Sequence, residues 1–342
     1  MKPHALAFAS FLFLLLLALP VQGGPGAPGY HIIDSVRLSG DTGWDYLTVD
    51  TSAERAYISR GTRVQVVDLL KREMIGEIAP TPGVHGIAID HRGGKGYISN
   101  GRDSSVTVFD LKTLATLAVV RIGARNPDAI MFDPYTKRVF TFNGGSGNAT
   151  ALETSTGEIA GMVPLGGKPE FAVSDGEGRV YVNIEDKSHV VEFDPKTLKV
   201  IQTWSTAPGE EPSGLAIDRV HHMLYSGCAN KLMVVLDAKN GHVVTTLPIG
   251  EGVDATAYDH GTGLAFSSNG DGTLTVAGGE KPGVLENAKT PRRARTMAVD
   301  EKTHLLYTVT ARFGSVPAPT AEQPRPRPPI EPGSVTLYIL GR

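Results

Sequence analysis

The amino-acid sequence predicts an all-β protein, a seven-bladed β-propeller built from four-stranded antiparallel blades. One repeat unit is clear at residues 85–110, where three short runs of alternating apolar and polar residues are separated by Gly, Asp, Ser and Asn. This pattern is typical of antiparallel strands joined by tight turns. The first strand of each unit ends in an Asp, found at Asp50, Asp90, Asp133, Asp175, Asp218, Asp259 and Asp300. These anchor residues are spaced by roughly 40 residues, which is the length of one propeller blade.

The two ends of the repeat region complement each other. Residues 31–38 have the pattern of a strand but no repeat precedes them, whereas the seventh repeat ends at Leu340 without an outer strand. We therefore expect the N-terminal strand to complete the last blade and close the ring, because closure pairs two edges that would otherwise be exposed. Although the chain has 342 residues, we expect residues 30–342 to form one domain, since repeats stack into a continuous core.

Each unit divides into an inner strand a, strands b and c, and an outer strand d. The a strands are expected at 46–49, 86–89, 129–132, 171–173, 214–217, 255–258 and 296–299. The b strands are expected at 56–59, 96–99, 139–142, 180–183, 224–226, 264–267 and 305–309. The c strands are expected at 64–68, 106–110, 149–153, 190–194, 232–237, 274–276 and 335–340. Outer strands are evident only in the first two units, at 74–78 and 116–122.

The N-terminal segment differs in composition from the repeats that follow it. Residues 1–23 combine a basic Lys2, an apolar run over residues 5–19 and a compact Gly23, a pattern that predicts a secretory signal peptide. An uncleaved membrane anchor is the alternative, although the apolar run is short for a span. Residues 24–29 are rich in Gly and Pro and are expected to form a flexible linker. We accordingly expect a secreted or periplasmic protein with no membrane span after signal cleavage.

Composition excludes some classes of function. The chain carries 33 basic and 36 acidic residues, a net charge of −3, which is unlike a general nucleic-acid binder, whose affinity comes from neutralising phosphates. Cys228 is the single cysteine, so no intramolecular disulfide forms, and it is expected to be a small buried residue. We expect a monomer whose partner is a small molecule or a protein.

A proline-rich insertion interrupts the seventh unit between strands b and c. Residues 313–333 contain seven prolines, which prevent this segment from joining a β-ladder and favour an extended surface loop. Loops of this length are often functional. The insertion is therefore either a lid or docking arm, or a tolerated elaboration of the fold.

The b strands share a further motif. They read Tyr57-Ile-Ser, Tyr97-Ile-Ser-Asn and Tyr181-Val-Asn, and the units continue into Val-x-Val-x-Asp or close variants. In this the chain resembles the YVTN-type β-propeller family, in particular its secreted or periplasmic YncE-like members, over roughly residues 30–342. Phe140 and Phe266 depart from the pattern by replacing the Tyr. The resemblance implies a seven-bladed ring and export, but the family's roles are diverse and mostly concern binding.

Candidate site residues follow from the repeat itself. The position five residues before each anchor Asp opens strand a at one mouth of the channel and is occupied by Asp45, His85, Asp128, Glu170, Ser213, Asp254 and Arg295. In a closed ring these side chains are expected to gather at that mouth, where repeat proteins commonly bind ligands. A wet, polar channel mouth without a ligand is the alternative.

A second tier is expected on the same face, from the b–c loops. It comprises Arg60, Asn100, Asn143, Asn183 and Asn269. Asn oxygens beside carboxylates suit a hard divalent cation, so a metal of unknown identity is one interpretation, and a metal-assisted hydrolase of the propeller lactonase type is the corresponding function. The other interpretation is that Asn occupies these turns because it adopts left-handed conformations readily.

The sequence contains no Gly-x-Ser-x-Gly elbow, Cys-x-x-Cys pair or phosphate loop, so a binding scaffold is favoured over an enzyme. Four acids against Arg295 make the mouth negative, which favours a cation, a metal or a polyhydroxylated molecule. Trp44 and Tyr46 flank Asp45 and suggest an aromatic rim. Carboxylates around His85 should favour its protonated form, and binding is expected to depend on pH.

A separate group of arginines around the last unit either steers an anionic partner or balances nearby acids; it comprises Arg292, Arg293, Arg295, Arg312, Arg325 and Arg327.

Overall fold

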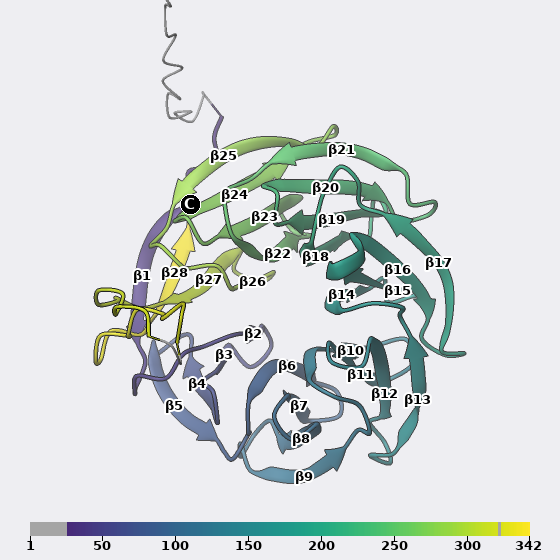
Figure 1. Cartoon of the computed structure of the whole chain (residues 1–342), viewed down its shortest axis with the longest axis horizontal. Helices are drawn as coiled ribbons and strands as arrows, with labels where there is room; N and C mark the ends of the chain where they lie inside the picture. Colours follow the sequence, from purple (N-terminus) through teal and green to yellow (C-terminus); the bar gives the residue numbers. More distant parts are fainter. Residues whose placement is uncertain (1–25, 321–322) are drawn as a thin grey trace, which may run out of the picture.

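Seven four-stranded antiparallel sheets surround a central channel in a computed structural model that describes residues 26–320 and 323–342 (Figure 1). This confirms the predicted fold class. The predicted signal peptide, residues 1–23, lies outside the described residues, as does the start of the predicted linker. Within the described part of the chain, no helix has the length and apolar character needed to cross a membrane.

Each blade contributes one strand to each of four layers, from the channel outward. The innermost strands are β2 (Leu47–Asp50), β6 (Val84–Asp90), β10 (Pro127–Asp133), β14 (Pro169–Ser174), β18 (Pro212–Asp218), β22 (Val253–Asp259) and β26 (Met297–Asp300). The second strands are β3 (Arg55–Ser59), β7 (Lys95–Asn100), β11 (Arg138–Asn143), β15 (Val180–Ile184), β19 (Met223–Cys228), β23 (Leu264–Asn269) and β27 (Leu305–Thr310).

The outer half of each blade is built in the same way. The third strands are β4 (Val64–Asp68), β8 (Ser105–Asp110), β12 (Asn148–Glu153), β16 (His189–Asp194), β20 (Leu232–Asp237), β24 (Thr273–Gly278) and β28 (Thr336–Gly341). The outermost strands are β5 (Glu73–Ile78), β9 (Thr116–Arg121), β13 (Ile159–Pro164), β17 (Lys199–Ser205), β21 (Val243–Pro248), β25 (Gly283–Lys289) and β1 (His31–Arg37). A short 3-10 helix, Glu185–Lys187, follows β15.

The N-terminal strand closes the ring, as the sequence predicts. Strand β1 lies at the outer edge of the seventh blade and pairs antiparallel with β28, in a register that places Val36 opposite Leu337 (Figure 1). Tyr30, Val36 and Leu38 are buried, so the strand adds apolar contacts as well as backbone hydrogen bonds. Sequence-distant ends of the chain are thereby held in one sheet.

The recurring Asp residues have a structural role in the turns. Asp50 Oδ1 accepts hydrogen bonds from the backbone N–H groups of Ser52 and Ala53, both at 3.0 Å. At the ends of the third strands, Asp68 Oδ1 accepts in the same way from Leu70. Asp side chains that bond to the backbone two residues further on stabilise tight turns, which explains why the repeat retains Asp at the ends of its strands.

Burial differs between the layers. The second and third strands are buried on both faces because neighbouring blades cover them, whereas outermost strands such as β9 are largely exposed. The apolar clusters lie between blades; one of them joins Ala56 and Ile58 of the first blade to Tyr307 and Val309 of the seventh. This packing holds the innermost strands in fixed positions around the channel.

The proline-rich insertion lies beside β1 at the edge of the ring (Figure 1). Within its described residues, strand-like pairing occurs at one isolated bridge between Phe313 and Ile330. The base of the insertion is further fixed by an ion pair between Arg312 and Glu331 at 2.8 Å and by a hydrogen bond from Gly314 N to Pro329 O at 2.9 Å.

Candidate functional site

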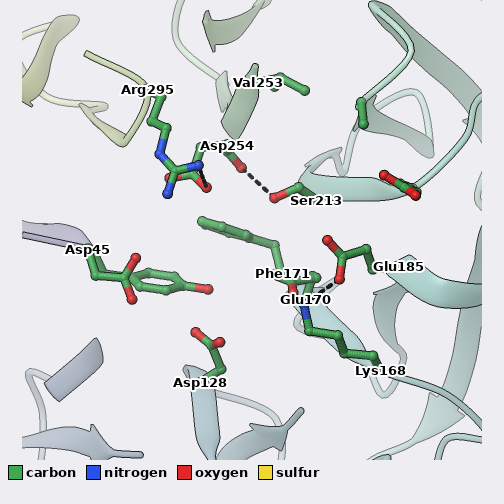
Figure 2. Close-up of a pocket in the computed structure, with 13 residues that line it drawn as sticks. Asp45, Asp128, Lys168, Glu170, Phe171, Glu185, Ser213, Val253, Asp254 and Arg295 are labelled. Carbon is green, nitrogen blue, oxygen red and sulfur yellow. Dashed lines mark hydrogen bonds and ion pairs between the residues drawn. The ribbon is translucent and has the colours of Figure 1, made fainter. Parts of the chain in front are cut away.

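The channel mouth contains a polar cavity of about 270 Å³. We call it the acidic cup and define it by its lining residues. These are Asp45, Tyr46, Asp128, Lys168, Glu170, Phe171, Glu185, Glu211, Ser213, Ala229, Val253, Asp254 and Arg295 (Figure 2). Six of the seven predicted mouth residues line it, and the seventh, His85, contacts two of them. The structure therefore brings the predicted ring of side chains together.

An aromatic pair lies one residue further into the channel. The rings of Tyr46 and Phe171, from the first and fourth blades, are stacked with centroids 4.8 Å apart and planes 25° apart. Tyr46 also packs against the apolar cluster of the third and fourth blades, so its side chain reaches across the channel. The pair gives the cup an apolar surface that a planar or cationic group can contact.

Small residues occupy the equivalent position in the other five blades: Gly86, Ala129, Gly214, Ala255 and Thr296. At Gly214, an added Cβ would lie 2.4 Å from the backbone nitrogen of Thr256. No side chain fits there, because the innermost strands of the fifth and sixth blades approach so closely. Because the innermost strands of these blades pack closely and carry small residues here, the space near the channel axis is occupied by the rings of Tyr46 and Phe171.

His85 connects two acids of the cup. Its Nδ1 lies 2.5 Å from Asp45 Oδ2 and 3.6 Å from Asp128 Oδ1. Burial acts to lower the pKa of His85, but the Asp45 hydrogen bond and the charge of Asp128 outweigh it and raise the pKa above its ordinary value. Gly101 leaves room for the imidazole, because an added Cβ there would lie 2.6 Å from His85 Nε2.

Asp128 and Asp254 are carboxylates held in an unfavourable environment. Burial raises the pKa of Asp128 to about 7, and the negative charge of Asp45 adds to this effect. Burial likewise raises the pKa of Asp254 to about 6, although Arg295 opposes the shift. Their cationic neighbours lie just beyond hydrogen-bonding distance, at 3.6 Å for His85 and 3.7 Å for Arg295. Both side chains are about four-fifths buried, so water compensates them only in part.

Lys168 neutralises a different part of the cup. Its Nζ pairs with Glu170 at 2.7 Å and with Glu185 (Figure 2). Burial acts to lower the pKa of Lys168, but its hydrogen bonds to both glutamates raise it. The backbone of Lys168 is held by Asp186, whose carboxylate accepts from its N–H at 2.7 Å. The ion pairs of Lys168 are thus with acids of the fourth blade, although its charge also acts to lower the pKa of Asp128.

The predicted second tier does not line the cup. Asn100, Asn143, Asn183 and Asn269 are fully buried, and none of them is among the lining residues. Asn143 Nδ2 donates to Asn148 and Thr150, both at 2.9 Å, within its own blade. Asn100, Asn143 and Asn269 end their strands and donate to the third strand of the same blade, whereas Asn183 lies inside β15 and donates to the next blade. The predicted second tier of site residues in the b–c loops therefore does not contribute to the cup.

The hydrogen-bond partners of the other three amides also lie in the blades. Asn100 Nδ2 donates to Thr107 at 2.9 Å, and Asn269 Nδ2 donates to Thr275 at 3.2 Å. Asn183 Nδ2 donates to the carbonyls of Ser213 and Gly214, both at 3.0 Å, and so links the fourth blade to β18, the innermost strand of the fifth. Arg60, in the corresponding position of the first blade, is also fully buried. These residues stabilise the blades that present the cup.

Sequence reasoning did not include Lys168, Glu185, Glu211 and Phe171 in the site. Three of them lie near the offset of five that located the mouth residues: Phe171 lies four residues before the anchor Asp175, Glu211 lies seven before Asp218, and Lys168 lies seven before Asp175. Glu185 had no such signal, because it lies in the short 3-10 helix of the fourth blade.

Fold and site together define a seven-bladed β-propeller with an acidic, partly aromatic cup at one mouth of its channel. Compared with known proteins, the chain matches no protein-family model. No curated protein matches it either.

Proposed function

We propose that this protein is an exported propeller of the YVTN type, similar to YncE-like proteins, that binds a small cationic molecule in the acidic cup. The observation that supports binding is the convergence of Asp45, Asp128 and Asp254 from three blades on one cavity. Among the described residues, their cationic neighbours are His85 and Arg295, with Lys168 acting on Asp128 from a greater distance. The acidic side chains that line the cup therefore outnumber its basic ones.

The energetics favour a cationic ligand. Burying a carboxylate without a close partner destabilises the folded protein, and groups kept in that state commonly mark functional sites. A ligand cation would supply the missing counter-charge, and the Tyr46–Phe171 pair would contact its apolar part. The volume of about 270 Å³ lies near the lower end of the range for ligand pockets, which indicates a small molecule.

Binding should strengthen as the pH rises from 5 to 8. Asp128 and Asp254, with pKa values raised to about 7 and about 6, are largely protonated and neutral at pH 5. A cation that binds their ionised forms must displace these protons, so its affinity increases as the pH passes through 6 and 7 and proton release accompanies binding.

The test is calorimetric titration with tetramethylammonium and with 1,4-diaminobutane at pH 5.5 and pH 8. We expect binding at pH 8 that is at least roughly tenfold weaker at pH 5.5 and is lost in the double variant Asp128→Asn, Asp254→Asn. Glu251→Gln is the matched control, because Glu251 is an exposed acid outside the cup. Equal affinity in the double variant and the native protein would show that the cup is not the site.

The export part of the proposal rests on residues 1–23 and has its own measurement. N-terminal sequencing of the protein isolated from its native cell should give a mature chain that begins at Gly24. A mature chain that retains Lys2 would contradict cleavage.

A metal-assisted hydrolase of the propeller lactonase type is the second candidate. Asp45, His85 and Asp128 offer ligand atoms that lie within 4.8 Å of one another, and carboxylate and imidazole ligands suit zinc. The fit is incomplete, because His85 Nδ1 is already bonded to Asp45 and would have to exchange that bond for a metal. Metal-dependent turnover of a lactone panel that Asp128→Asn abolishes would favour this candidate, and inactivity with every divalent metal added would exclude it.

A further inference from the structure

A second cavity, of about 660 Å³, lies beside the acidic cup and has the opposite charge. We call it the arginine groove and define it by its lining residues. These are Gly43, Trp44, Gly252, Gly270, Arg293, Arg295, Phe313, Val316, Pro326, Arg327, Pro328 and Ile330. Among the described residues, its lining contains three arginines and no acidic residue. It adjoins the cup because Arg295 lines both cavities and appears at the border of the cup in Figure 2.

The groove combines cationic and aromatic surfaces. The guanidinium carbon of Arg293 lies 4.4 Å from the centroid of the Phe313 ring, a stacking distance that leaves the edge of the guanidinium available for hydrogen bonds. The Trp44 and Phe313 rings are 6.2 Å apart at 48°, so Trp44 adds a second flat apolar surface. A guanidinium edge beside flat rings is suited to a carboxylate joined to a planar apolar body.

The groove arginines are poorly neutralised by the protein itself. Among the described residues, Arg293 and Arg327 form no ion pair, and Arg295 has only Asp254 at 3.7 Å. Nearby Arg312 differs, because Glu331 pairs with it at 2.8 Å. Of the six arginines around the seventh blade, Arg312 is therefore paired at the base of the insertion, whereas the three that line the groove have no acidic partner closer than 3.7 Å among the described residues.

The walls of the groove are held in place by local structure. Arg293 has a left-handed backbone with φ of 64°, and its N–H donates to Gly270 O at 2.8 Å. Phe313 is fixed by its bridge to Ile330. Arg327 lies between Pro326 and Pro328, whose rings restrict the backbone on both sides. The backbone positions of these groove residues are thus set before any ligand arrives.

We propose that the arginine groove binds a small organic anion in which a carboxylate is attached to a flat apolar group. The carboxylate pairs with Arg293 and Arg327, and the flat group packs against Trp44 and Phe313. The proline-rich insertion supplies one wall of this site. This site is independent of cation binding in the acidic cup.

The test uses 2-naphthoate as the probe and the fluorescence of Trp44 as the readout. The chain has two tryptophans, and the other, Trp204, stacks on Tyr181 in another blade. A Trp204→Phe background leaves Trp44 as the single tryptophan. We expect 2-naphthoate to change its fluorescence saturably, with an affinity that falls as salt rises, since the arginines are exposed.

Arginine variants locate the anion. Arg293→Gln and Arg327→Gln should each weaken 2-naphthoate binding by roughly tenfold, because each removes a charge-assisted hydrogen bond. Arg292→Gln and Arg325→Gln are the matched controls: they remove the same charge from neighbouring exposed positions that do not line the groove, and they should leave the affinity within about twofold. Arg327→Gln lies on the exposed insertion and does not disturb a blade.

Three results would overturn the proposal. Equal binding of the neutral 2-naphthamide would show that the groove recognises only an apolar body. Displacement of 2-naphthoate by inorganic phosphate at equal or lower concentration would assign the groove to phosphate instead of an aromatic carboxylate. Unchanged affinity in both Arg293→Gln and Arg327→Gln would place the anion elsewhere. None of these outcomes depends on whether tetramethylammonium binds in the cup.

Discussion

At the scale of a single residue, Asp128 illustrates a conflict between stability and charge. Its carboxyl group is buried among other acids, and burial raises its pKa to about 7 from an ordinary value of 3.8. The folded protein therefore holds this proton more tightly than the unfolded chain does. By linkage, the ionised group destabilises the fold, and this penalty grows as the pH rises from about 4 to about 7.

We predict that Asp128→Asn stabilises the protein at pH 8 by on the order of 2–4 kcal/mol and changes its stability little at pH 4. The amide keeps the shape of the side chain and removes the buried charge. The measurement is the free energy of unfolding from urea denaturation at both pH values.

Asp110→Asn is the control for the sign of this effect. Backbone and side-chain hydrogen bonds from Thr113 lower the pKa of Asp110, so its ionised form stabilises the fold above the unfolded-state pKa and this contribution is lost as the pH falls. The control variant should not gain stability at pH 8. A loss of stability in Asp128→Asn at pH 8 would contradict the assignment of Asp128 as a strained carboxylate.

Single residues also show what the sequence could and could not predict about the site. The offset from the anchor Asp located Asp45, Asp128 and Asp254 because a regular repeat places equivalent residues at equivalent points of a ring. The second tier was assigned to the loops between second and third strands, and this failed for Asn143, because it is the last residue of β11 and its side chain bonds to Thr150 within the blade. No offset could predict that Tyr46 and Phe171 stack, since that contact joins two blades across the channel.

At the scale of an element, Arg60 organises the connection between β1 and β2. Its buried guanidinium donates from Nη1 to Gln65 Oε1 at 2.6 Å and from Nη2 to the carbonyls of Gly40 and Thr42, both at 2.9 Å. Burial lowers the pKa of Arg60 to about 10, yet its charge is retained at neutral pH. One side chain thus satisfies several backbone carbonyls in a connection that contains no strand of its own.

We predict that Arg60→Met destabilises the protein by about 2–4 kcal/mol, because it leaves the buried Gln65 Oε1 and two part-buried backbone carbonyls without their donor. Lys71→Met is the control: it makes the same kind of change in the same blade, but Lys71 is exposed and its Asp68 partner is 3.8 Å away, so the expected loss is under about 0.5 kcal/mol. Chemical denaturation measures both values. Equal stability of the two variants would mean that the Arg60 hydrogen bonds add nothing to the fold.

The elements differ in how well the sequence predicted them. Second and third strands such as β7 and β8 were predicted because they carry the recurring β-branched and aromatic residues of the repeat, in short runs of alternating apolar and polar residues. Outermost strands such as β17 were missed because most of their residues are exposed and carry little apolar pattern. The 3-10 helix was also missed, since three residues are too few to establish a period.

At the scale of the whole molecule, the pairing of β1 with β28 makes the ring a closed structure. A chain that begins at Ser39 would lack β1, would expose the edge of β28 and would lose the buried side chains of Tyr30, Val36 and Leu38. Unpaired strand edges promote aggregation. We predict that this truncated chain aggregates or unfolds at a temperature well below that of a chain beginning at Gly24.

A peptide of residues 26–38, added in excess, should restore part of the lost stability because it can occupy the vacant edge. Thermal unfolding followed by circular dichroism, together with light scattering, measures both effects. A truncated chain that is as stable as the longer one would show that β1 is dispensable for closure.

The same pairing has a consequence for the timing of folding during synthesis. A ribosome produces the chain from its N-terminus at about 5–20 residues per second, so β1 emerges first among the described strands and its partner β28 emerges last. Until β28 has been synthesised, β1 has no native partner, and the first blade lacks the seventh blade that covers one of its faces. Ring closure therefore cannot precede the synthesis of β28, and until then the unpaired β1 can pair with a wrong strand edge.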